Sequence, residues 1–430
     1  MRVVLVCVLT CFLACASTGR HQPARASEPL LAGVSELDIT PAEPIRLTGY
    51  ANRTAPSEGV RGRLWVKALA IGDRQRVAVL MAADLIGVPA RLADEVARRL
   101  ESRGVDRAHV AIGVTHTHTG PSLSGVLPGI LAPPPPPDQQ DTIDRYTRGL
   151  VETFERAAVA ALADRRPAVI GWTQGRAGFA MNRRILKDGK WTGFGSDPSG
   201  VVDHDLPMLA VRAPDGRLRA VLVSYACHAT TLEGKDNFVH GDWPAVAKEL
   251  IQGRHPGAIA LVTIGTGADA NPNPRGGGLL DVERHAREVA DEVDRLLQTP
   301  LHPLTSAPVG RFRRIDLAFA GVERAAPYPV QTWTFGDALT MVFLGGEVVA
   351  DYGLRLKREL DATRLWVNAY SNDVAFYVAS RRMIPEGGYE VDRSMLYYGQ
   401  PGPLAESTED RIVDAVIELA PAARQTTARE

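Results

Sequence analysis

The chain has 430 residues, of which 45% are hydrophobic and 23% charged, with 49 basic against 50 acidic side chains. This is the composition of a folded globular protein, long enough for one large domain or two to three smaller ones. Because charge is nearly balanced and no basic stripe or acidic tail stands out, nucleic acid is not expected as a partner.

The N-terminus has the pattern of an export signal. Arg2 precedes an apolar run, Val3 to Ala14, that is too short to span a bilayer, and small residues follow it. The segment ending at Cys15 approximates a bacterial lipoprotein box, so we expect either a lipoprotein lipidated at Cys15 or a plain secreted protein. The predicted organisation is a signal peptide over 1–18, a linker over 19–30 and one folded domain over 31–430. The expected location is the periplasm, the outer membrane or the outside of the cell, with membrane association through the N-terminal lipid in the lipoprotein case.

Downstream of the linker, apolar runs of strand length alternate with amphipathic helical patterns. Strands are predicted at 77–84, 109–115, 168–173, 207–213, 219–228, 258–265, 338–346 and 365–371. Helices are predicted at 90–102, 141–162, 281–298 and 347–360. Continuous apolar strands indicate a sheet that helices cover on its faces. Because several strands around 168–228 are consecutive, the fold class we expect is α/β with a mixed sheet.

Two segments are predicted to be irregular. The proline run at 132–140 cannot join a sheet or a helix interior, so it is predicted to be a surface loop. The glycine-rich stretch at 271–280 is expected to be a loop as well.

Polar side chains collect where the predicted strands end. These side chains are His116 and His118, then His228, Asp269 and Asn271, then Glu347, and finally Asn372, Asp373 and Tyr377. Ligand sites of helix-covered sheets form outside the carboxyl ends of the strands. We therefore expect these residues to share one pocket at the C-terminal ends of the strands.

The sequence "GVTHTHTGPS" places His116 and His118 two residues apart at the end of an apolar run. In an extended strand, residues i and i+2 point to the same face. Two histidines, a third histidine and a glutamate would supply the ligand types of a catalytic zinc site with room for water. The spacing alone fits equally well a histidine pair that only packs and hydrogen-bonds.

The sequence contains other motifs that compete with this hypothesis. The segment from Gly265 to Ala270 loosely matches a dinucleotide fingerprint, but the prolines that follow disfavour the helix that this fingerprint must open. Cys227 is the only cysteine beyond the signal, so no disulfide within the folded domain is expected. It precedes His228 and would face the opposite way, as a small buried residue. Asp84 is expected either to support the site or to cap a strand, and Asp242 either to orient a histidine or to form a turn.

These blocks together resemble the neutral ceramidases, which are zinc amidases that hydrolyse the N-acyl bond of ceramide. "THTHTGP" resembles the family's Thr-His-Thr-His-Ser-Gly-Pro motif, and further similar blocks occur in the same order over roughly 33–415. They are "DITP" and "LTGYANR" (38–53), "MNRR" (181–184), "YACHATTL" (225–232), "GADANPN" (267–273), "LGGEVVADYGLRL" (344–356) and "FYVASRRMIPEGGYE" (376–390).

The resemblance implies a role for particular residues. The zinc ligands would be His116, His228, Glu347 and Tyr377, the last placed by its spacing from Tyr389. His118 and Arg183 would lie beside the substrate, for contacts to an oxyanion or a carboxylate. Beside these residues, our hypothesis gives Asp269 the role of orienting a ligand or serving as a base.

The sequence departs from the family in two ways. Asn271 stands where the family has a loop serine, and asparagine is neither a nucleophile nor a proton shuttle, although it donates hydrogen bonds to an oxyanion. No counterpart of the family's C-terminal β-sandwich domain is expected in this sequence, which weakens the case for ceramide itself as the substrate. The resemblance thus implies an exported, zinc-dependent hydrolase of a small-molecule or lipid N-acyl amide. A zinc esterase or lactonase on the same site, or an envelope binding protein that has lost catalysis, are the alternatives.

Overall fold

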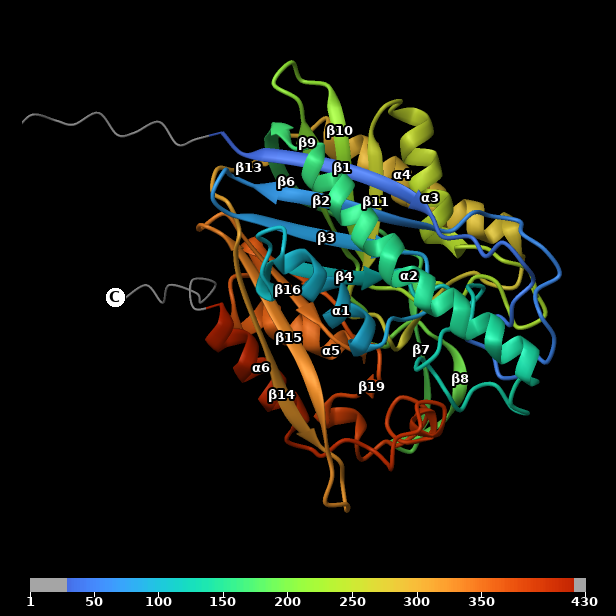
Figure 1. The fold of residues 1–430 in the computed structure, drawn as a ribbon. Coiled ribbons are helices and arrows are strands. Elements are labelled where there is room, and N and C mark those ends of the chain that lie inside the picture. Colours follow the sequence, from blue (N-terminus) through green and yellow to red (C-terminus); the bar gives the residue numbers. More distant parts are fainter. Residues whose placement is uncertain (1–28, 421–430) are drawn as a thin grey trace, which may run out of the picture.

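The computed structural model describes residues 29–420. The predicted signal peptide with Cys15, residues 19–28 of the predicted linker and residues 421–430 lie outside the described residues. Within 29–420 the strands form several sheets, mostly of mixed direction, with helices on their flanks (Figure 1). The predicted α/β class with a mixed sheet core is confirmed, and the core is divided among sheets rather than built on one.

The first sheet contains the N-terminal strands. In spatial order its strands are β4 (Val110–Val114), β3 (Val77–Ala83), β2 (Trp65–Gly72), β1 (Leu31–Asp38) and β5 (Arg166–Pro167). β3 and β4 are parallel, whereas β1, β2 and β3 pair antiparallel. A parallel pair needs a crossover connection, and α1 (Ala90–Glu101) provides it between β3 and β4.

The second sheet has the same mixed character. Its strands are β11 (Ile259–Ile264), β10 (Leu218–Tyr225), β9 (Asp205–Arg212), β6 (Val169–Arg176) and β13 (His302–Leu304). β10 and β11 are parallel, and α3 (Asp242–Arg254) connects them. The sequence patterns did not predict α3, whose apolar face is interrupted by Lys248 and Gln252.

Three smaller sheets complete the strand arrangement. One contains β12 (Ala270–Pro272), β7 (Ala180–Lys187) and β8 (Lys190–Asp197). Another contains β14 (Val309–Ala318), β15 (Ala325–Phe335), β16 (Leu339–Leu344) and β18 (Leu365–Asn368). The last is the parallel pair of β17 (Glu347–Val348) and β19 (Tyr377–Val378).

The sequences of these strands are continuously apolar because both faces of the sheets are buried. Along β3, Val79 and Met81 belong to the hydrophobic cluster shared with the helices, while Ala78 and Leu80 belong to a second cluster that also holds Trp366. That second cluster draws residues from the first, second and β14–β18 sheets, so it is the layer between sheets. Successive strand residues point to opposite faces, which assigns alternate residues to the two layers.

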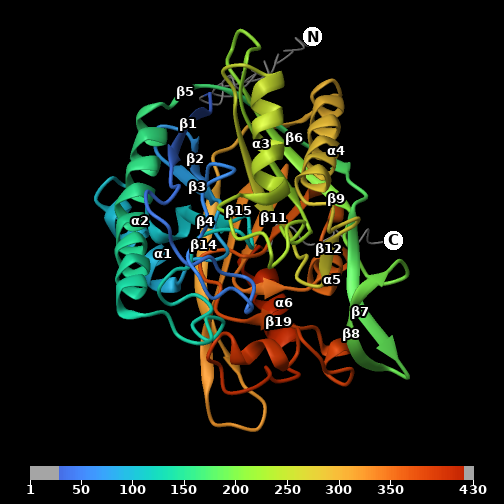
Figure 2. The same ribbon diagram turned by 90° about the vertical axis from the view of Figure 1, so that its right-hand side faces the viewer.

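Helices cover the outer faces. α2 (Pro137–Ala163) contacts β1, β2 and β3, whereas α3 contacts β11 and α4 (Leu279–Leu297) contacts β6 and β9. Figure 2 shows α1 and α2 on one side of the molecule and α3 and α4 on the other. α5 (Ala350–Glu359) follows β17, and α6 (Thr408–Leu419) packs on β14 and β15. Among residues 29–420, no helix combines the length and the apolarity needed to cross a membrane.

Several predicted boundaries are wrong. The loop predicted over 271–280 overlaps the end of β12 (Ala270–Pro272) and the start of α4 (Leu279–Leu297). The proline run was predicted to be a loop over 132–140, but α2 begins inside it, at Pro137. Proline suits the first position of a helix, where its missing N–H has no partner to lose. The helix predicted over 347–360 begins only at Ala350, because Glu347 and Val348 are extended and pair with β19.

The ends of strands from three sheets meet at residues 369–371. Val114 N, just at the end of β4, donates to the Tyr370 carbonyl (3.3 Å), and Ala369 N donates to Ile264 O of β11 (2.9 Å). Tyr370 N donates to Gly346 O after β16 (3.1 Å). These bonds bring the C-terminal ends of β4, β11, β16 and β18 to one place.

Candidate metal centre and active site

Three histidine rings converge beyond these strand ends. His116 and His118 follow β4, and His228 follows β10. Their ring centroids lie 4.9 Å (His116–His118), 4.9 Å (His116–His228) and 5.6 Å (His118–His228) apart. His116 and His228 have no exposed surface, and His118 is partly exposed. His118 therefore lies on the open side of the cluster.

The rings of His116 and His118 do meet, but the prediction that strand alternation brings them together is wrong. β4 ends at Val114, and His116 has φ +55°, in the left-handed region. The pair is therefore set by a turn and not by strand alternation. Few non-glycine residues adopt this backbone conformation, and those that do are often at functional sites.

Each ring is oriented by a backbone carbonyl that faces its Nδ1. The contacts are His116 to Ile86 O (2.6 Å), His118 to Gly49 O (3.0 Å) and His228 to Gly267 O (3.0 Å). A carbonyl only accepts, so each ring carries a proton on Nδ1 and turns its Nε2 toward the other members of the cluster. The Nε2 atoms of His116 and His118 then face each other at 3.2 Å.

Two facing lone pairs repel unless a proton or a cation lies between them. Burial, reinforced by the neighbouring His116, lowers the pKa of His118 well below its usual range. Burial and the Arg183 charge lower the pKa of His228 to about 4. Both rings are neutral near pH 7, which is the protonation state that binds a metal.

Glu347 joins the cluster from β17. Its Oε2 lies 3.0 Å from His116 Nε2 and 3.1 Å from His228 Nε2, and its side chain is buried. Burial alone would raise the pKa of this carboxyl, but the contacts with His116 and His228 hold it well below its usual range. Tyr398 donates its phenol proton to Oε1, so only Oε2 is offered to the cluster.

Tyr377 is brought to Glu347 by the β17–β19 ladder, in which the two residues are register partners. Its hydroxyl oxygen lies 3.3 Å from His228 Nε2 and accepts a hydrogen bond from Arg183 Nη2 (3.0 Å). Burial raises the pKa of Tyr377 well above its usual range, while the Arg183 charge opposes that rise. The guanidinium thus favours the phenolate, the form that would bind a cation.

Arg183, on β7, is buried and its donors are all directed at protein groups. Nε donates to Glu390 Oε1 (2.8 Å), Nη2 to Tyr377 and Nη1 to Asn271 Oδ1 (3.4 Å). Nη1 also lies 3.4 Å from His228 Nε2. Arg183 therefore lies at the site, as expected for it, but its contacts organise neighbouring residues.

Asp269 lies beneath the site and has no exposed surface. Oδ1 accepts from Ala350 N at the start of α5 (2.9 Å), and Oδ2 accepts from Asn182 Nδ2 (3.0 Å). Burial raises its pKa to about 6. Asp269 contacts none of the proposed ligands directly; its two oxygens support the segments that carry Glu347 and Arg183.

The separations between neighbouring ligand atoms are slightly shorter than the edges of a zinc tetrahedron. With zinc–nitrogen bonds of about 2.0–2.1 Å, tetrahedral ligand atoms lie about 3.3–3.4 Å apart. The four separations given above, among His116, His118, His228, Glu347 and Tyr377, run from 3.0 to 3.3 Å. His116, His118 and His228 form a group able to hold a metal ion, and the Nδ1-anchored rings and the nearby Glu347 carboxylate fit one.

The remaining candidates lie outside this set. Asp84 binds Lys248, Trp65 N and Thr115 Oγ1, so it ties β3 to α3 and to the residue before His116. Asp242 is the first residue of α3, and its carboxylate accepts from the Leu232 and Trp243 amides. The carboxylate of Asp242 contacts no histidine of the cluster among the described residues; it anchors backbone amides at the start of α3. Cys227 is buried and free, as predicted.

The segment 265–270 does not open a helix. Ala270–Pro272 forms β12 and pairs with β7. This confirms the argument against the dinucleotide fingerprint.

Sequence patterns missed three residues that support the site. Tyr398 binds Glu347, Glu390 binds Arg183, and Gly49 supplies the carbonyl facing His118. A Cβ at Gly49 would lie 2.6 Å from His118 Cγ, so only glycine fits there. The glycine in "LTGYANR" was visible in the sequence, but its approach to His118 is a tertiary contact.

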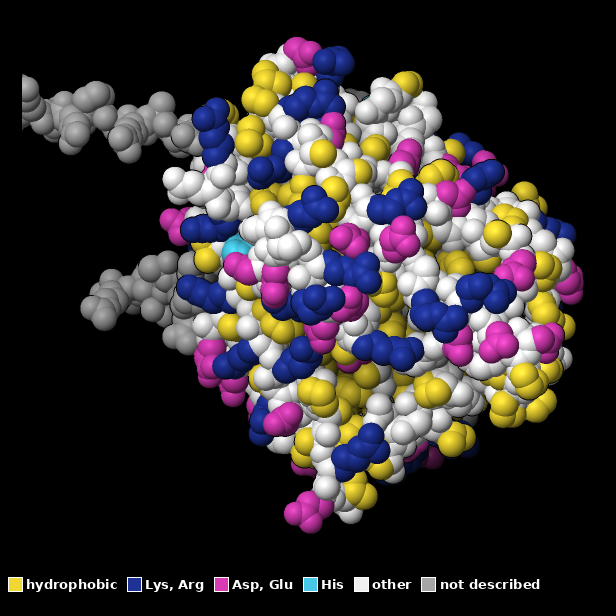
Figure 3. All heavy atoms as spheres, in the orientation of Figure 1, with side chains coloured by type: hydrophobic (Ala, Val, Ile, Leu, Met, Phe, Trp, Pro, Cys, Tyr) yellow, Lys and Arg dark blue, Asp and Glu magenta, His cyan; other side chains and the backbone are white. Residues whose placement is uncertain are grey.

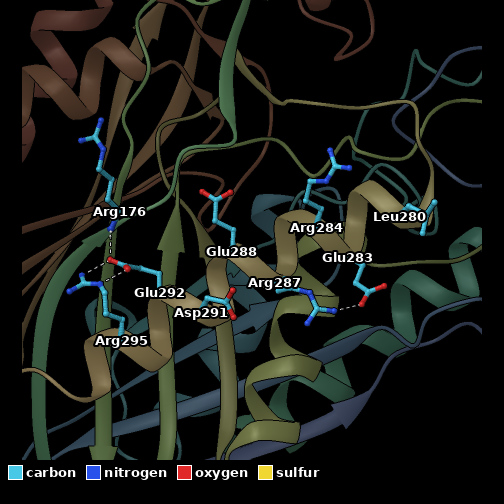
Figure 4. Close-up of a pocket in the computed structure, with 9 residues that line it drawn as sticks. All are labelled: Arg176, Leu280, Glu283, Arg284, Arg287, Glu288, Asp291, Glu292 and Arg295. Carbon is cyan, nitrogen blue, oxygen red and sulfur yellow. Dashed lines mark hydrogen bonds and ion pairs between the residues drawn. The ribbon is translucent and has the colours of Figure 1, made fainter.

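A surface depression of about 650 Å³ lies elsewhere, along α4 (Figure 4). It is lined by Arg176, Leu280, Glu283, Arg284, Arg287, Glu288, Asp291, Glu292 and Arg295. The arginines of α4 pair with acids of the same helix: Arg284 with Asp281, Arg287 with Glu283 and Arg295 with Glu292. None of the predicted site residues lines it, so we interpret it as a solvated helix face. Basic and acidic side chains are similarly interspersed over the face shown in Figure 3.

Comparison with known proteins places the chain in a family. The family model for neutral/alkaline non-lysosomal ceramidase, N-terminal, matches residues 30–261. The neutral ceramidase of Pseudomonas aeruginosa has a similar fold, with a TM-score of 0.72 and 16% identity over 92% of this chain and 75% of that one. A structure described as a ceramidase complexed with C2 matches with a TM-score of 0.73 and 16% identity, over 93% of this chain and 77% of that one. The chain belongs to the neutral/alkaline non-lysosomal ceramidase family.

Proposed function

We propose that the protein is an exported, zinc-dependent hydrolase that cleaves an N-acyl amide with water. The observation that carries the proposal is that Glu347 Oε2 lies 3.0 Å from His116 Nε2 and 3.1 Å from His228 Nε2, in a chain of the ceramidase family. The match to a ceramidase complexed with C2 supports a lipid N-acyl amide as the substrate class.

His116, His228 and Glu347 are the three ligands that would hold Zn²⁺, with Tyr377 as the fourth. A bound Zn²⁺ lowers the pKa of water to about 7 and polarises a carbonyl. Glu347 brings the negative charge that compensates the cation, and the hydrogen bond from Tyr398 keeps its carboxylate in one orientation.

His118 is partly exposed on the open side of the set, which supports a role in contacting the substrate. Its Nδ1–H donates to the Gly49 carbonyl, so Nε2 is the atom that would accept a proton or complete the ligand set. Asn271 would donate its amide hydrogens to the oxyanion of the tetrahedral intermediate. Arg183 holds Tyr377 and Asn271 in place, and Asp269 holds the segments behind them.

The test is elemental analysis of the purified mature protein, followed by assays on N-acyl amides of varied chain length and on the matched esters. We expect about one zinc per chain, loss of turnover on chelation and recovery with zinc. His228→Ala should lose both metal and turnover. Full activity of that variant without metal would refute the proposal, and hydrolysis of the esters alone would favour the esterase or lactonase alternative. Metal binding without any turnover would favour the binding-protein alternative.

The fourth ligand is identified by comparing His118→Ala with Tyr377→Phe. Loss of a ligand weakens zinc binding, whereas loss of a substrate contact lowers turnover at saturating zinc. We expect Tyr377→Phe to weaken zinc binding and His118→Ala to lower turnover. The reverse result would exchange the two roles.

Export is proposed on the N-terminal pattern alone. Mass measurement of the protein from cell fractions tests it. A start after the signal without added mass indicates a secreted protein, and added lipid mass at Cys15 indicates a lipoprotein. An intact Met1 in the cytoplasmic fraction would contradict export.

A further inference from the structure

Asn271 is held at the edge of the metal centre by two side chains. It lies on β12, opposite Met181 of β7, and 9% of its surface is exposed. Oδ1 accepts a hydrogen bond from Arg183 Nη1 (3.4 Å) and another from Thr230 Oγ1 (3.2 Å). Arg183 Nη1 is also 3.4 Å from His228 Nε2, so the amide of Asn271 adjoins the ligand set.

These contacts determine which way the amide faces. A guanidinium only donates, so the atom of Asn271 that faces Arg183 must be the carbonyl oxygen. An amide oxygen has two lone pairs, and here Arg183 and Thr230 engage both. Within residues 29–420, Nδ2 has no hydrogen-bond acceptor and is not sealed from solvent. Its two N–H groups are therefore the uncommitted donors of this side chain.

Thr230 is well placed to enforce this orientation. It lies two residues after His228 and only 3% of its surface is exposed. Its hydroxyl donates to Asn271, and no other hydrogen bond of this hydroxyl is present among the described residues. Valine has the same shape without the hydroxyl, so the contact can be removed with little change in packing.

We infer that Thr230 is a positioning residue for the reaction: its hydroxyl holds Asn271 Oδ1 away from the substrate, so that the Nδ2 hydrogens are presented to the anionic oxygen of the tetrahedral intermediate. The inference rests on the proposed amide hydrolysis. Neither Thr230 nor Asn271 forms a covalent bond. Without the hydroxyl, the amide can rotate and place its oxygen toward an oxyanion, which repels it.

The test compares Thr230→Val with Thr230→Ser, and adds Thr230→Val in the Asn271→Ala background. Removing one oxyanion donor typically lowers kcat by about 100- to 1,000-fold. We expect Asn271→Ala to fall in that range and Thr230→Val to lower kcat by at least about 10-fold with KM little changed. Thr230→Ser should stay within about 3-fold of the parent. In the Asn271→Ala background, Thr230→Val should lower kcat no further, because the effect of Thr230 on kcat depends on Asn271. An equal loss in both backgrounds would overturn the inference.

Thr408→Val is the matched control. The Thr408 hydroxyl is also buried, at 2% exposure, but it has no hydrogen-bond partner among the described residues and lies on α6. This variant should keep the parental kcat, and bound zinc should be equal in all of these variants.

A second readout does not depend on turnover. In zinc-loaded protein labelled with [¹⁵N]asparagine, the side-chain amide signal of Asn271 is identified by its loss in Asn271→Ala. Thr230→Val should shift or broaden this signal, and Thr408→Val should not. An unchanged signal in Thr230→Val would overturn the inference even if no N-acyl amide were hydrolysed. Failure of the wild type to hydrolyse any N-acyl amide would instead contradict the proposed function.

Discussion

Glu347 and Tyr377 are register partners in the two-residue parallel ladder of β17 and β19. The ladder is short, but it places a carboxylate and a phenol beside His228, with separations of 3.1 and 3.3 Å from its Nε2. Gly346, with φ +71°, precedes Glu347, and a Cβ there would lie 2.8 Å from Phe376 O. The glycine therefore permits the close approach of the two strands that creates the ladder.

Tyr398→Phe should weaken zinc binding. The Tyr398 hydroxyl fixes Glu347 through Oε1, and loss of such a supporting contact typically costs about 10- to 100-fold in metal affinity. We expect the zinc Kd to rise about 10-fold while turnover at saturating zinc stays within a few-fold. Competition with a zinc-binding dye measures this. Tyr370→Phe is the control, because the Tyr370 hydroxyl is buried without a partner among the described residues. A similar Kd in both variants would contradict the role of Tyr398.

Gly49→Ala should displace His118. The added Cβ would lie 2.6 Å from His118 Cγ, and Gly49 has φ +93°, so both overlap and backbone strain oppose the substitution. We expect kcat/KM to fall at least about 10-fold, because small misplacements of reacting groups are costly. Gly104→Ala isolates the backbone strain, since Gly104 has φ +80° with open space around its Cβ position. That control should lose stability and keep kcat/KM, and an equal loss of kcat/KM in both would contradict the prediction.

Arg183→Lys should lower activity more than Arg184→Lys. Both arginines are buried and both bind Glu390, but only Arg183 reaches Tyr377 and Asn271. Lysine keeps the charge and loses the fork that serves these partners at once. We expect kcat/KM to fall about 100-fold in Arg183→Lys and less than 5-fold in Arg184→Lys. Thermal unfolding checks that both variants are folded, and comparable losses of kcat/KM would contradict the prediction.

His240 should make the protein less stable in mild acid. It is buried, its Nδ1 accepts from Asp242 N (2.9 Å), and burial lowers its pKa to about 4. An unfolded histidine has a pKa of about 6.5, so the unfolded chain takes up the proton first. The contribution of the neutral His240 ring to the free energy of unfolding is fully present above about pH 6.5 and is lost as pH falls toward 4. Its full size is about 3 kcal/mol, from the two pKa values.

Urea unfolding at pH 7.5 and pH 5 measures this effect. His240→Asn keeps an acceptor near the Nδ1 position and removes the titration. The difference in unfolding free energy between the two pH values should therefore be smaller in His240→Asn than in the parent. The remaining histidines titrate in both proteins and cancel in the comparison. An identical pH dependence would show that His240 is not responsible.

The apolar runs and their order were enough to predict the α/β class. The predicted strand at 77–84 is β3 (Val77–Ala83), and the predicted helix at 90–102 is α1 (Ala90–Glu101). Polar residues after strands also marked His116, His228 and Glu347 as candidates, and the structure brings these three together. Such features are local, because burial on both faces of a strand and the residues that end it leave a pattern within a few positions.

The tertiary structure decided the arrangement of the site. Glu347 pairs with Tyr377 only through strand register, and His116 depends on a left-handed backbone conformation. Arg183 donates to Tyr377, and Thr230 donates to Asn271, only because the fold brings these residues together. It also placed Tyr398 on Glu347 and Gly49 against His118. These contacts join residues far apart in the chain. They depend on strand register and on close packing between sheets, which no short stretch of sequence specifies alone.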